Sequence, residues 1–178
     1  MDILEELMED AVKCGFSHVG PLDVSTIVLR KEARDACAEN KCGRYGVNWS
    51  CPPGCGTLEE CEQMIRKYHR GILVQTTGDI DTFNYESYLE VGRRHNGLFD
   101  EFARIVRKKV PGALLAGAAA CSNCESCTYP DAPCRFPDRL SYPMEGLGMI
   151  VSQVCRDNGL KYHYGSGTIT YIACVLID

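Results

Sequence analysis

The sequence predicts an α/β fold: a single layered domain with a mixed β-sheet, helices on the faces of the sheet, and two long cysteine-rich loops. Two observations lead to this fold class. Segments with apolar residues at helical spacing alternate along the chain with short apolar runs that are typical of strands. Two stretches rich in cysteine, glycine and proline, residues 37–56 and 121–134, interrupt this alternation and disfavour regular structure.

The first half of the chain contains one cysteine-rich stretch between predicted helices and strands. Residues 2–14 predict a surface helix that Gly15 ends, because apolar side chains at helical spacing oppose acidic ones. Residues 16–19 and 24–29 predict strands, and residues 30–36 a short charged helix. Thr57 and Glu60 form a capping box, which predicts a helix from there to about Arg70. The apolar run 71–77 then predicts a buried strand.

The second half repeats this order of elements. Residues 84–109 predict a helix, broken near Gly92 or Gly97, whose basic end complements the helix dipole rather than forming a binding patch. Residues 113–119 predict a strand, and residues 141–158 a helix with proline in its first turn. Residues 160–164 and 168–177 predict a terminal hairpin, with the last strand inside the sheet because both of its faces are apolar. One domain over 1–178 is expected, and two pseudo-halves, 1–80 and 81–178, are an alternative description.

Composition and charge narrow the classes of function. The 178 residues are 45% hydrophobic and 24% charged, as in ordinary soluble globular proteins. The sequence contains no apolar run of about 18 residues and no signal peptide, so we expect a cytoplasmic protein without a membrane partner. The net charge of −5 arises from five acids in the first ten residues, and the rest has equal numbers of acids and bases. Nothing in this balance predicts binding to nucleic acid.

The second cysteine stretch carries the strongest signal for a metal. Cys121, Cys124 and Cys127 are separated by two residues each, and Cys134 follows after six more. Such an uninterrupted triplet is typical of [4Fe–4S] proteins, because three thiolates on one tight loop can converge on one cluster. Structural zinc sites more often show two separate Cys-x2-Cys pairs. Zinc, and an ordinary disulfide or free-thiol loop, remain alternatives.

The first cysteine stretch predicts a second metal site. Thiols of a cytosolic protein are kept reduced, so clustered cysteines there favour metal ligands or redox groups over disulfides. Cys37, Cys42 and Cys51 lie in an irregular loop of about twenty residues, a length that favours a function or a bound group. A fourth ligand is expected from Cys55 or Cys61. Cys61 faces inward from its predicted helix, so a role as a small core residue is the alternative.

Other candidate residues have simpler interpretations. Cys14, Cys155 and Cys174 lie at apolar positions and are expected to be packing residues. The four histidines lack metal-ligand spacing, and His95 is the best placed of them for proton transfer if the protein is an enzyme. Tyr45 and Trp49 are expected to shield a cluster from water. Arg44 and Arg135 are candidates for stabilising the negative charge of the thiolates.

The motifs together resemble a known family. The resemblance lies in Arg34-x2-Cys37-x4-Cys42-x2-Tyr45-Gly, Trp49-x-Cys51-Pro-Pro, the triplet from Cys121, and Pro133-Cys-Arg-x-Pro with Met144-Glu-Gly. Over residues 15–177 the chain is similar to DUF2284, a family of predicted metal-binding proteins. The family motif more usually reads Met-Glu-Ala. The resemblance implies a small cytosolic protein, typical of anaerobes and presumed to carry [4Fe–4S] clusters. It supports one site with Cys37, Cys42 and Cys51, and another with Cys121, Cys124, Cys127 and Cys134; the additional Cys55 leaves the fourth ligand of the first site open.

Three functions are consistent with this pattern. The leading hypothesis is an iron–sulfur protein with two [4Fe–4S] clusters that transfers electrons to or from a redox partner protein. The second is an enzyme in which one cluster has an open iron site, and the third is a zinc-stapled structural or interaction module. The chain has no phosphate-binding glycine loop and no Ser/His/Asp motif, so nucleotide cofactors and hydrolase chemistry are not expected. The sequence does not decide whether the protein is an enzyme. It also does not identify a substrate, a redox partner or an oligomeric state.

Overall fold

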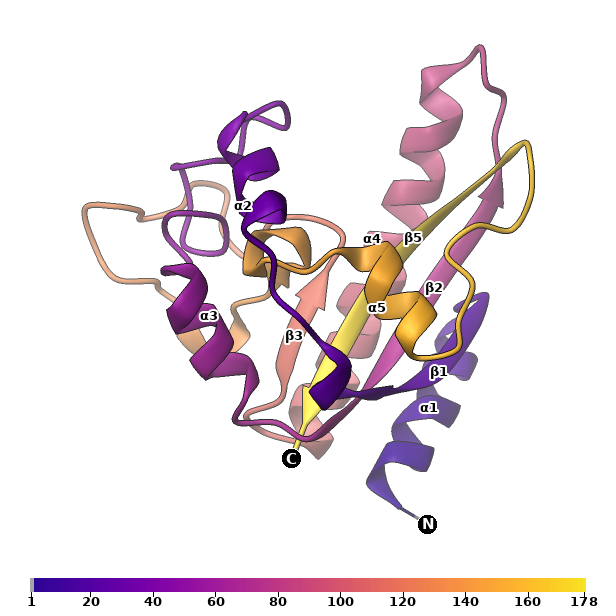
Figure 1. Ribbon diagram of the computed structural model, residues 1–178, viewed down its shortest axis with the longest axis horizontal. Coiled ribbons are helices and arrows are strands. Elements are labelled where there is room, and N and C mark those ends of the chain that lie inside the picture. The colour runs from indigo at the N-terminus through magenta and orange to yellow at the C-terminus, as the bar shows by residue number, and fades with distance from the viewer. Residues whose placement is uncertain (1) are drawn as a thin grey trace.

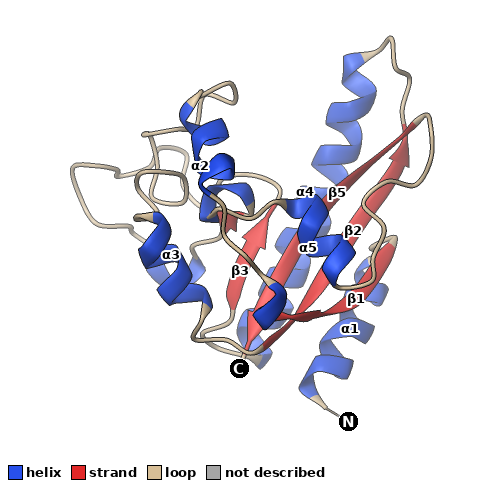
Figure 2. Cartoon of the chain, in the orientation of Figure 1, coloured by secondary structure: helices blue, strands red, loops and turns tan. Residues whose placement is uncertain are grey.

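The fold is built on one five-stranded mixed sheet. The computed structural model describes residues 2–178. The strand order is β1-β2-β5-β3-β4, with β1 (His18–Asp23), β2 (Arg70–Asp79), β5 (Thr168–Ile177), β3 (Leu114–Gly117) and β4 (Tyr142–Pro143). All pairs are antiparallel except β3 with β4, which is parallel. The predicted α/β class with a mixed sheet is therefore confirmed (Figure 2).

The sheet separates two apolar layers. Strands β2 and β5 pair over their full length, with Ile72 opposite Val175. Successive residues of a strand point to opposite faces. Cys174 and Leu176 accordingly pack in one layer, and Ala173 and Val175 in the other. The last strand lies inside the sheet, as its continuous apolar sequence predicts.

Helices cover both faces of the sheet. Helices α1 (Ile3–Cys14) and α4 (Tyr85–Lys109) pack on one face through residues that include Leu7 and Phe102. Helices α3 (Leu58–Ile65) and α5 (Val151–Asp157) pack on the other face. Helix α2 (Lys31–Ala38) packs against the short 3-10 helix η3 (Glu145–Leu147). Both long loops lie at the side of the molecule that carries α2 and α3 (Figure 1).

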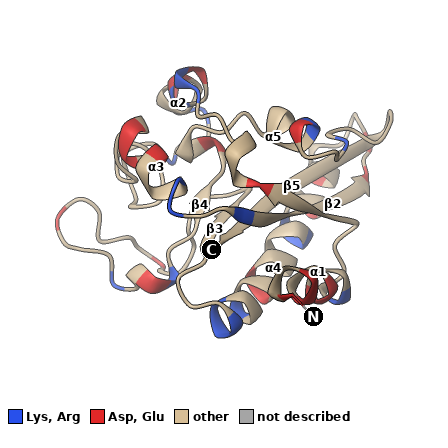
Figure 3. Cartoon of the chain, turned by 60° about the horizontal axis from the view of Figure 1, so that its bottom comes forward, with Lys and Arg blue, Asp and Glu red and all other residues tan. Residues whose placement is uncertain are grey.

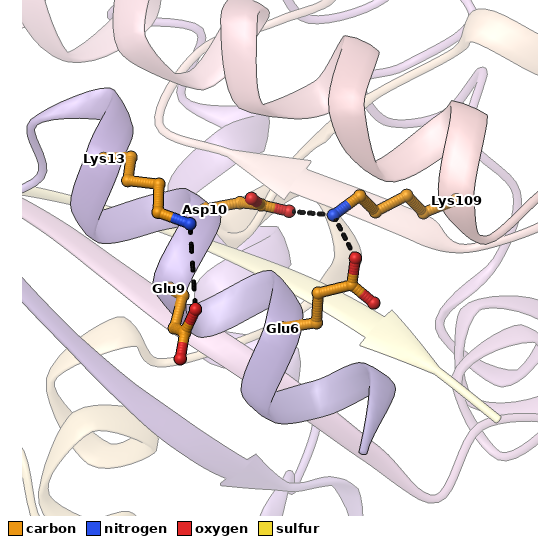
Figure 4. Close-up of polar contacts among 5 residues, drawn as sticks. All are labelled: Glu6, Glu9, Asp10, Lys13 and Lys109. Carbon is orange, nitrogen blue, oxygen red and sulfur yellow. Dashed lines mark hydrogen bonds and ion pairs between the residues drawn. The ribbon is translucent and has the colours of Figure 1, made fainter. Parts of the chain in front are cut away.

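Ion pairs join α1 to the end of α4. Figure 3 shows acidic residues along α1. Lys109, the last residue of α4, places its Nζ atom 2.5 Å from Oε1 of Glu6 and 2.6 Å from Oδ2 of Asp10 (Figure 4). Glu9 and Lys13 form a further pair within α1. At least Lys109 of this basic end is thus paired within the protein.

The predicted strand over residues 24–29 is wrong. Residues Val24–Thr26 form a 3-10 helix, η1, and Leu29 alone makes a β-bridge, with Met149. The side chain of Asp23 accepts a hydrogen bond from the Ser25 amide at 2.9 Å, and the Thr26 hydroxyl donates to the Asp23 carbonyl at 2.6 Å. Such local side-chain bonds compete with strand pairing.

The prediction of a helix opening at Ser141 is also wrong. Tyr142 and Pro143 pair instead with β3, and α5 begins only at Val151. Gly148 separates the two parts because its φ of 101° is left-handed, which a helix cannot continue through. A Cβ atom at this position would also lie 2.5 Å from Cδ1 of Leu58.

Two further expectations are corrected. Residues 160–164 form no hairpin strand, and their backbone is held by Gln75, whose Nε2 atom donates to the Lys161 carbonyl at 2.8 Å. Helix α4 continues through Gly92 and Gly97 without a break. Gly92 allows α4 to approach the sheet closely, because a Cβ there would lie 3.1 Å from the Tyr171 ring.

Among residues 2–178, no helix combines the length and the apolar character needed to cross a bilayer.

Candidate metal centres

The first cysteine loop is organised by a buried asparagine. The Oδ1 atom of Asn48 accepts hydrogen bonds from the amides of Ser50 and Cys51, at 3.0 and 2.9 Å, and from the Ser50 hydroxyl at 2.7 Å. Its Nδ2 atom donates to the Arg44 carbonyl at 3.0 Å. Asn48 and Ser50 are almost fully buried. One side chain therefore fixes the turn that presents the Cys51 thiol.

Three cysteines of this loop line one cavity, which we name the first cavity. Its volume is about 380 Å³, and Cys37, Cys42 and Cys51 form part of its wall. The same wall contains Arg44, Tyr45, Glu145 and residues 118–120. Cys37 comes from the end of α2, whereas Glu145 begins η3. The contact between these two short helices therefore brings the cysteines and the carboxylate to one space.

The thiols of the first cavity are close enough to influence each other's charge. Burial raises the pKa of Cys37, and neighbouring Glu145, Cys51 and Cys42 raise it further. Burial also raises the pKa of Cys51, against the lowering effect of hydrogen bonds from Asn48 and Ser50. The pKa of the Glu145 carboxyl is raised by desolvation. A group of ionisable side chains that disfavours several negative charges is one that a bound cation would stabilise.

The four cysteines of the second loop line a second cavity. Its volume is about 220 Å³, and its wall includes Cys121, Cys124, Cys127 and Cys134. Hydrogen bonds hold the loop closed: Arg135 donates to the Ser126 carbonyl at 2.7 Å, and the Thr128 hydroxyl donates to the Pro133 carbonyl at 2.8 Å. All four thiols are partly exposed.

The two cavities lie side by side. Arg44 forms part of both walls. The Cys121 amide donates to the Ser50 hydroxyl at 2.9 Å, so each loop contacts the other next to one of its cysteines. Trp49 adds a second connection, because its Nε1 atom donates to the Ala132 carbonyl at 3.1 Å and its ring packs edge-on against Tyr129. The sequence stretches 37–56 and 121–134 thus form one continuous structure.

A family model matches this chain over residues 20–177, and its description is predicted metal-binding protein, DUF2284. The chain belongs to this family. No curated protein and no solved structure matched the chain in the corresponding searches. The matched range contains all of these cysteine motifs and every cysteine that lines the two cavities. The family assignment and the twelve cysteines support a metal-binding protein.

Two of the cysteines proposed as ligands do not line either cavity in this DUF2284 member, although Cys55 contacts Cys51 and Gly146 of the first cavity's wall. Cys55 and Cys61 belong to neither cavity wall. Among residues 2–178, no three His, Cys, Asp or Glu side chains are grouped tightly enough to hold one metal ion. The candidate ligands of each set therefore occupy separate positions on a cavity wall.

The remaining cysteines and His95 lie away from these cavities. Cys155 and Cys174 are fully buried in the apolar layer beneath α3 and α5, and Cys14 packs against the opposite layer. His95 is fully buried between α4 and the sheet, which places it outside both cysteine-lined cavities. Its assignment as the best-placed residue for proton transfer therefore has no support in the geometry.

Sequence reasoning missed Asn48 and Ser50, which connect the two loops. A signal was present in the run Asn48-Trp-Ser-Cys51, because asparagine often hydrogen-bonds to the backbone two residues ahead. The contact of Ser50 with Cys121 could not be read in this way, since 71 positions separate the two residues.

Proposed function

We propose that the protein binds two [4Fe–4S] clusters, one at each cysteine-lined cavity, and transfers single electrons between them and a redox partner protein. The observation that carries this proposal is the adjacency of the two cavities, which share Arg44 and are joined by the hydrogen bond between Ser50 and Cys121. Electron transfer between two centres benefits from short separation and a folded protein around them.

The residues present fit such clusters. Cysteine thiolates are the usual ligands of iron–sulfur clusters, and each cavity offers three or four of them. When bound, the clusters would supply one-electron redox chemistry. Because burial raises the pKa of Cys37 and Cys51, binding at the first cavity would release protons from these thiols.

Other side chains near the cavities have supporting roles in this proposal. Arg44 brings a positive charge to both sets of thiolates, which would lower the electrostatic cost of gathering them. Ser50 fixes the distance between the two loops, and Trp49 packs on the second loop where it limits access of water.

A second candidate function is an enzyme with an open iron site. Only three cysteines line the first cavity, and the rest of its wall includes Arg44, Tyr45 and Glu145. An iron without a cysteine ligand could bind a substrate there, with these polar side chains to orient it. Loss of the cluster from Cys55→Ser or Cys61→Ser variants would contradict this candidate, because it would make one of these thiols the fourth ligand.

Cysteine variants test the two-cluster proposal. Anaerobically purified Cys42→Ser and Cys124→Ser variants should each lose about half of the iron and sulfide, because each removes a ligand from one of two separate four-iron clusters. Cys14→Ser is the matched control, since this partly exposed thiol lies outside both cavities, and it should keep the full content.

The same samples separate the alternatives. Bleaching of the visible absorption by dithionite, and return of the electrons to methyl viologen, would support electron transfer. Full iron content in both variants would contradict the assigned ligands. Zinc in place of iron would contradict the redox function and favour a zinc-stapled module.

A further inference from the structure

Cys55 and Cys61 are neighbouring thiols that line neither of the two proposed cluster sites. Cys55 lies at the end of the first loop, and Cys61 lies in α3, where it is fully buried. Each thiol changes the pKa of the other, as expected for neighbouring side chains. The Cys55 sulfur also lies 3.5 Å from the Gly146 carbonyl oxygen, and the Cys61 sulfur 3.6 Å from the Cys55 carbonyl oxygen. These contacts hold two oxidisable side chains near one another.

An arginine is fixed next to this pair. Arg34 donates from Nη1 to the Cys61 sulfur at 3.4 Å and from Nη2 to the Gly56 carbonyl at 2.6 Å. A guanidinium in this position stabilises a thiolate, which is the reactive form of cysteine. The hydrogen bond from Cys55, together with Arg34, lowers the pKa of Cys61 to about 7. The pKa of Cys55 is raised, first by its hydrogen bond to Cys61 and then by burial.

Only one thiol of the pair faces an accessible space. Cys55 lines a third cavity of about 490 Å³, together with Trp49, Tyr142 and the loop residues 130–134. Cys61 is not part of this wall and has no exposed surface. A volume of this size is typical of small-molecule sites. The arrangement therefore offers one thiol for attack on a ligand and keeps the second behind it.

We propose that Cys55 and Cys61 are a redox-active dithiol, which exchanges with a low-molecular-weight disulfide bound in the third cavity. Cys61 first ionises and releases its proton to solvent. As a thiolate it takes the proton of Cys55, which attacks one sulfur of the disulfide, so that a mixed disulfide forms and one thiolate leaves. Cys61 then gives this proton to the leaving thiolate and attacks the Cys55 sulfur, which releases the second thiolate; that thiolate takes up a proton from solvent. The net reaction converts two protein thiols and one disulfide into one protein disulfide and two small thiols, with two electrons transferred.

This reaction is independent of the proposed clusters. Its reactants are only the two thiols and the disulfide, and no iron takes part, although Cys134 lines both the second and the third cavity. Iron and sulfide measured on the same samples keep the two proposals distinguishable, since either can fail alone.

Disulfide mapping tests the proposal on the unaltered chain. The anaerobically purified protein is equilibrated with increasing ratios of oxidised to reduced glutathione, or of 2-hydroxyethyl disulfide to its thiol, and free thiols are then alkylated under denaturing conditions. Cleavage after Glu59 or Glu60 separates the two cysteines in sequence, so a bond between them leaves two peptides joined. The joined peptides should increase with either probe. Cys155 and Cys174, which are both fully buried and line none of the three cavities, should stay reduced.

Variants identify the role of each thiol. In Cys61→Ser, the mixed disulfide should accumulate on Cys55 because no second thiol resolves it, whereas Cys55→Ser should leave Cys61 unmodified. Arg34→Gln should slow disulfide formation about tenfold, because the thiolate loses its positive partner. Circular dichroism of each variant verifies folding.

Two results would overturn the proposal. One is a Cys55–Cys61 pair that stays reduced in the unaltered protein at every ratio of both probes. The other is a loss of about four irons per chain from Cys55→Ser or Cys61→Ser, since this would make the residue a cluster ligand.

Discussion

Two residues of the first loop that are not candidate ligands, Asn48 and Ser50, position the cysteines of the candidate metal centres. Asn48 binds no metal in the proposed sites, yet it satisfies two backbone amides and one hydroxyl at once. Ser50, which Asn48 holds in place, accepts a hydrogen bond from the Cys121 amide and so connects the first loop to the second. Buried polar groups of this kind are costly to leave without a partner. The positions of the cysteines in both loops thus depend on a side chain that is not a candidate ligand.

Replacement of Asn48 by alanine should therefore destabilise both loops. It leaves three buried donors without their acceptor, so we expect a loss of about 3 kcal/mol in the free energy of unfolding. Urea unfolding measures this loss, and iron analysis should show reduced content at both sites. Asn48→Asp keeps the acceptor oxygen and should recover part of the stability.

Lys41→Ala is the matched control for this experiment. Lys41 belongs to the same loop, but its side chain is exposed and forms only a surface ion pair with Glu39. The control should change stability by less than about 0.5 kcal/mol. An equally small effect of Asn48→Ala would contradict the structural role assigned to Asn48.

At the scale of elements, α4 packs on the sheet through a buried histidine. The Nδ1 atom of His95 lies 2.8 Å from the Thr76 hydroxyl on β2, and its ring packs among Phe16, Phe99 and Tyr171. The Nε2 atom has no hydrogen-bond partner among the described residues. Burial lowers the pKa of His95 to about 4. The interface between α4 and β2 is thus built for a neutral imidazole.

The pH dependence of stability follows from this pKa. Between about pH 6.5 and pH 4 the unfolded chain binds a proton at His95 that the folded chain does not, so this residue lowers stability as the pH falls through that range. The contribution between pH 7 and pH 4.5 should be about 2 kcal/mol. Urea unfolding of the unaltered protein and of His95→Gln, at both pH values, isolates it. Equal pH dependence of the two proteins would contradict the buried neutral state.

The sequence predicted elements well where the signal is local. The capping box at Thr57 and the apolar periodicity of α4 identify helices because each depends on residues a few positions apart. Residues 24–29 and 141–146 were assigned incorrectly, since Asp23 competes with strand pairing and β3 recruits Tyr142 into the sheet. Spacing along the sequence is enough to group the cysteines into two sets. It does not show that Cys55 faces a different cavity from Cys37, Cys42 and Cys51, because that depends on the fold.

At the scale of the whole molecule, the sheet supports one continuous cysteine-rich structure. The first loop lies between α2 and α3, and the second follows β3. The two loops are therefore far apart in sequence, although they contact each other in the fold. Their contact depends on pairing between distant segments, which periodicity and spacing do not encode. This contact makes the two proposed clusters neighbours, and it is the basis of the proposed electron transfer.

The metal content of the anaerobically purified protein tests this account most directly. Iron, zinc and acid-labile sulfide are measured per chain, together with the absorption spectrum. Two [4Fe–4S] clusters predict about eight irons and eight sulfides, with a broad visible band that reductant bleaches. About two zinc ions without sulfide would contradict the account, because the cysteine loops would then be structural and without redox chemistry.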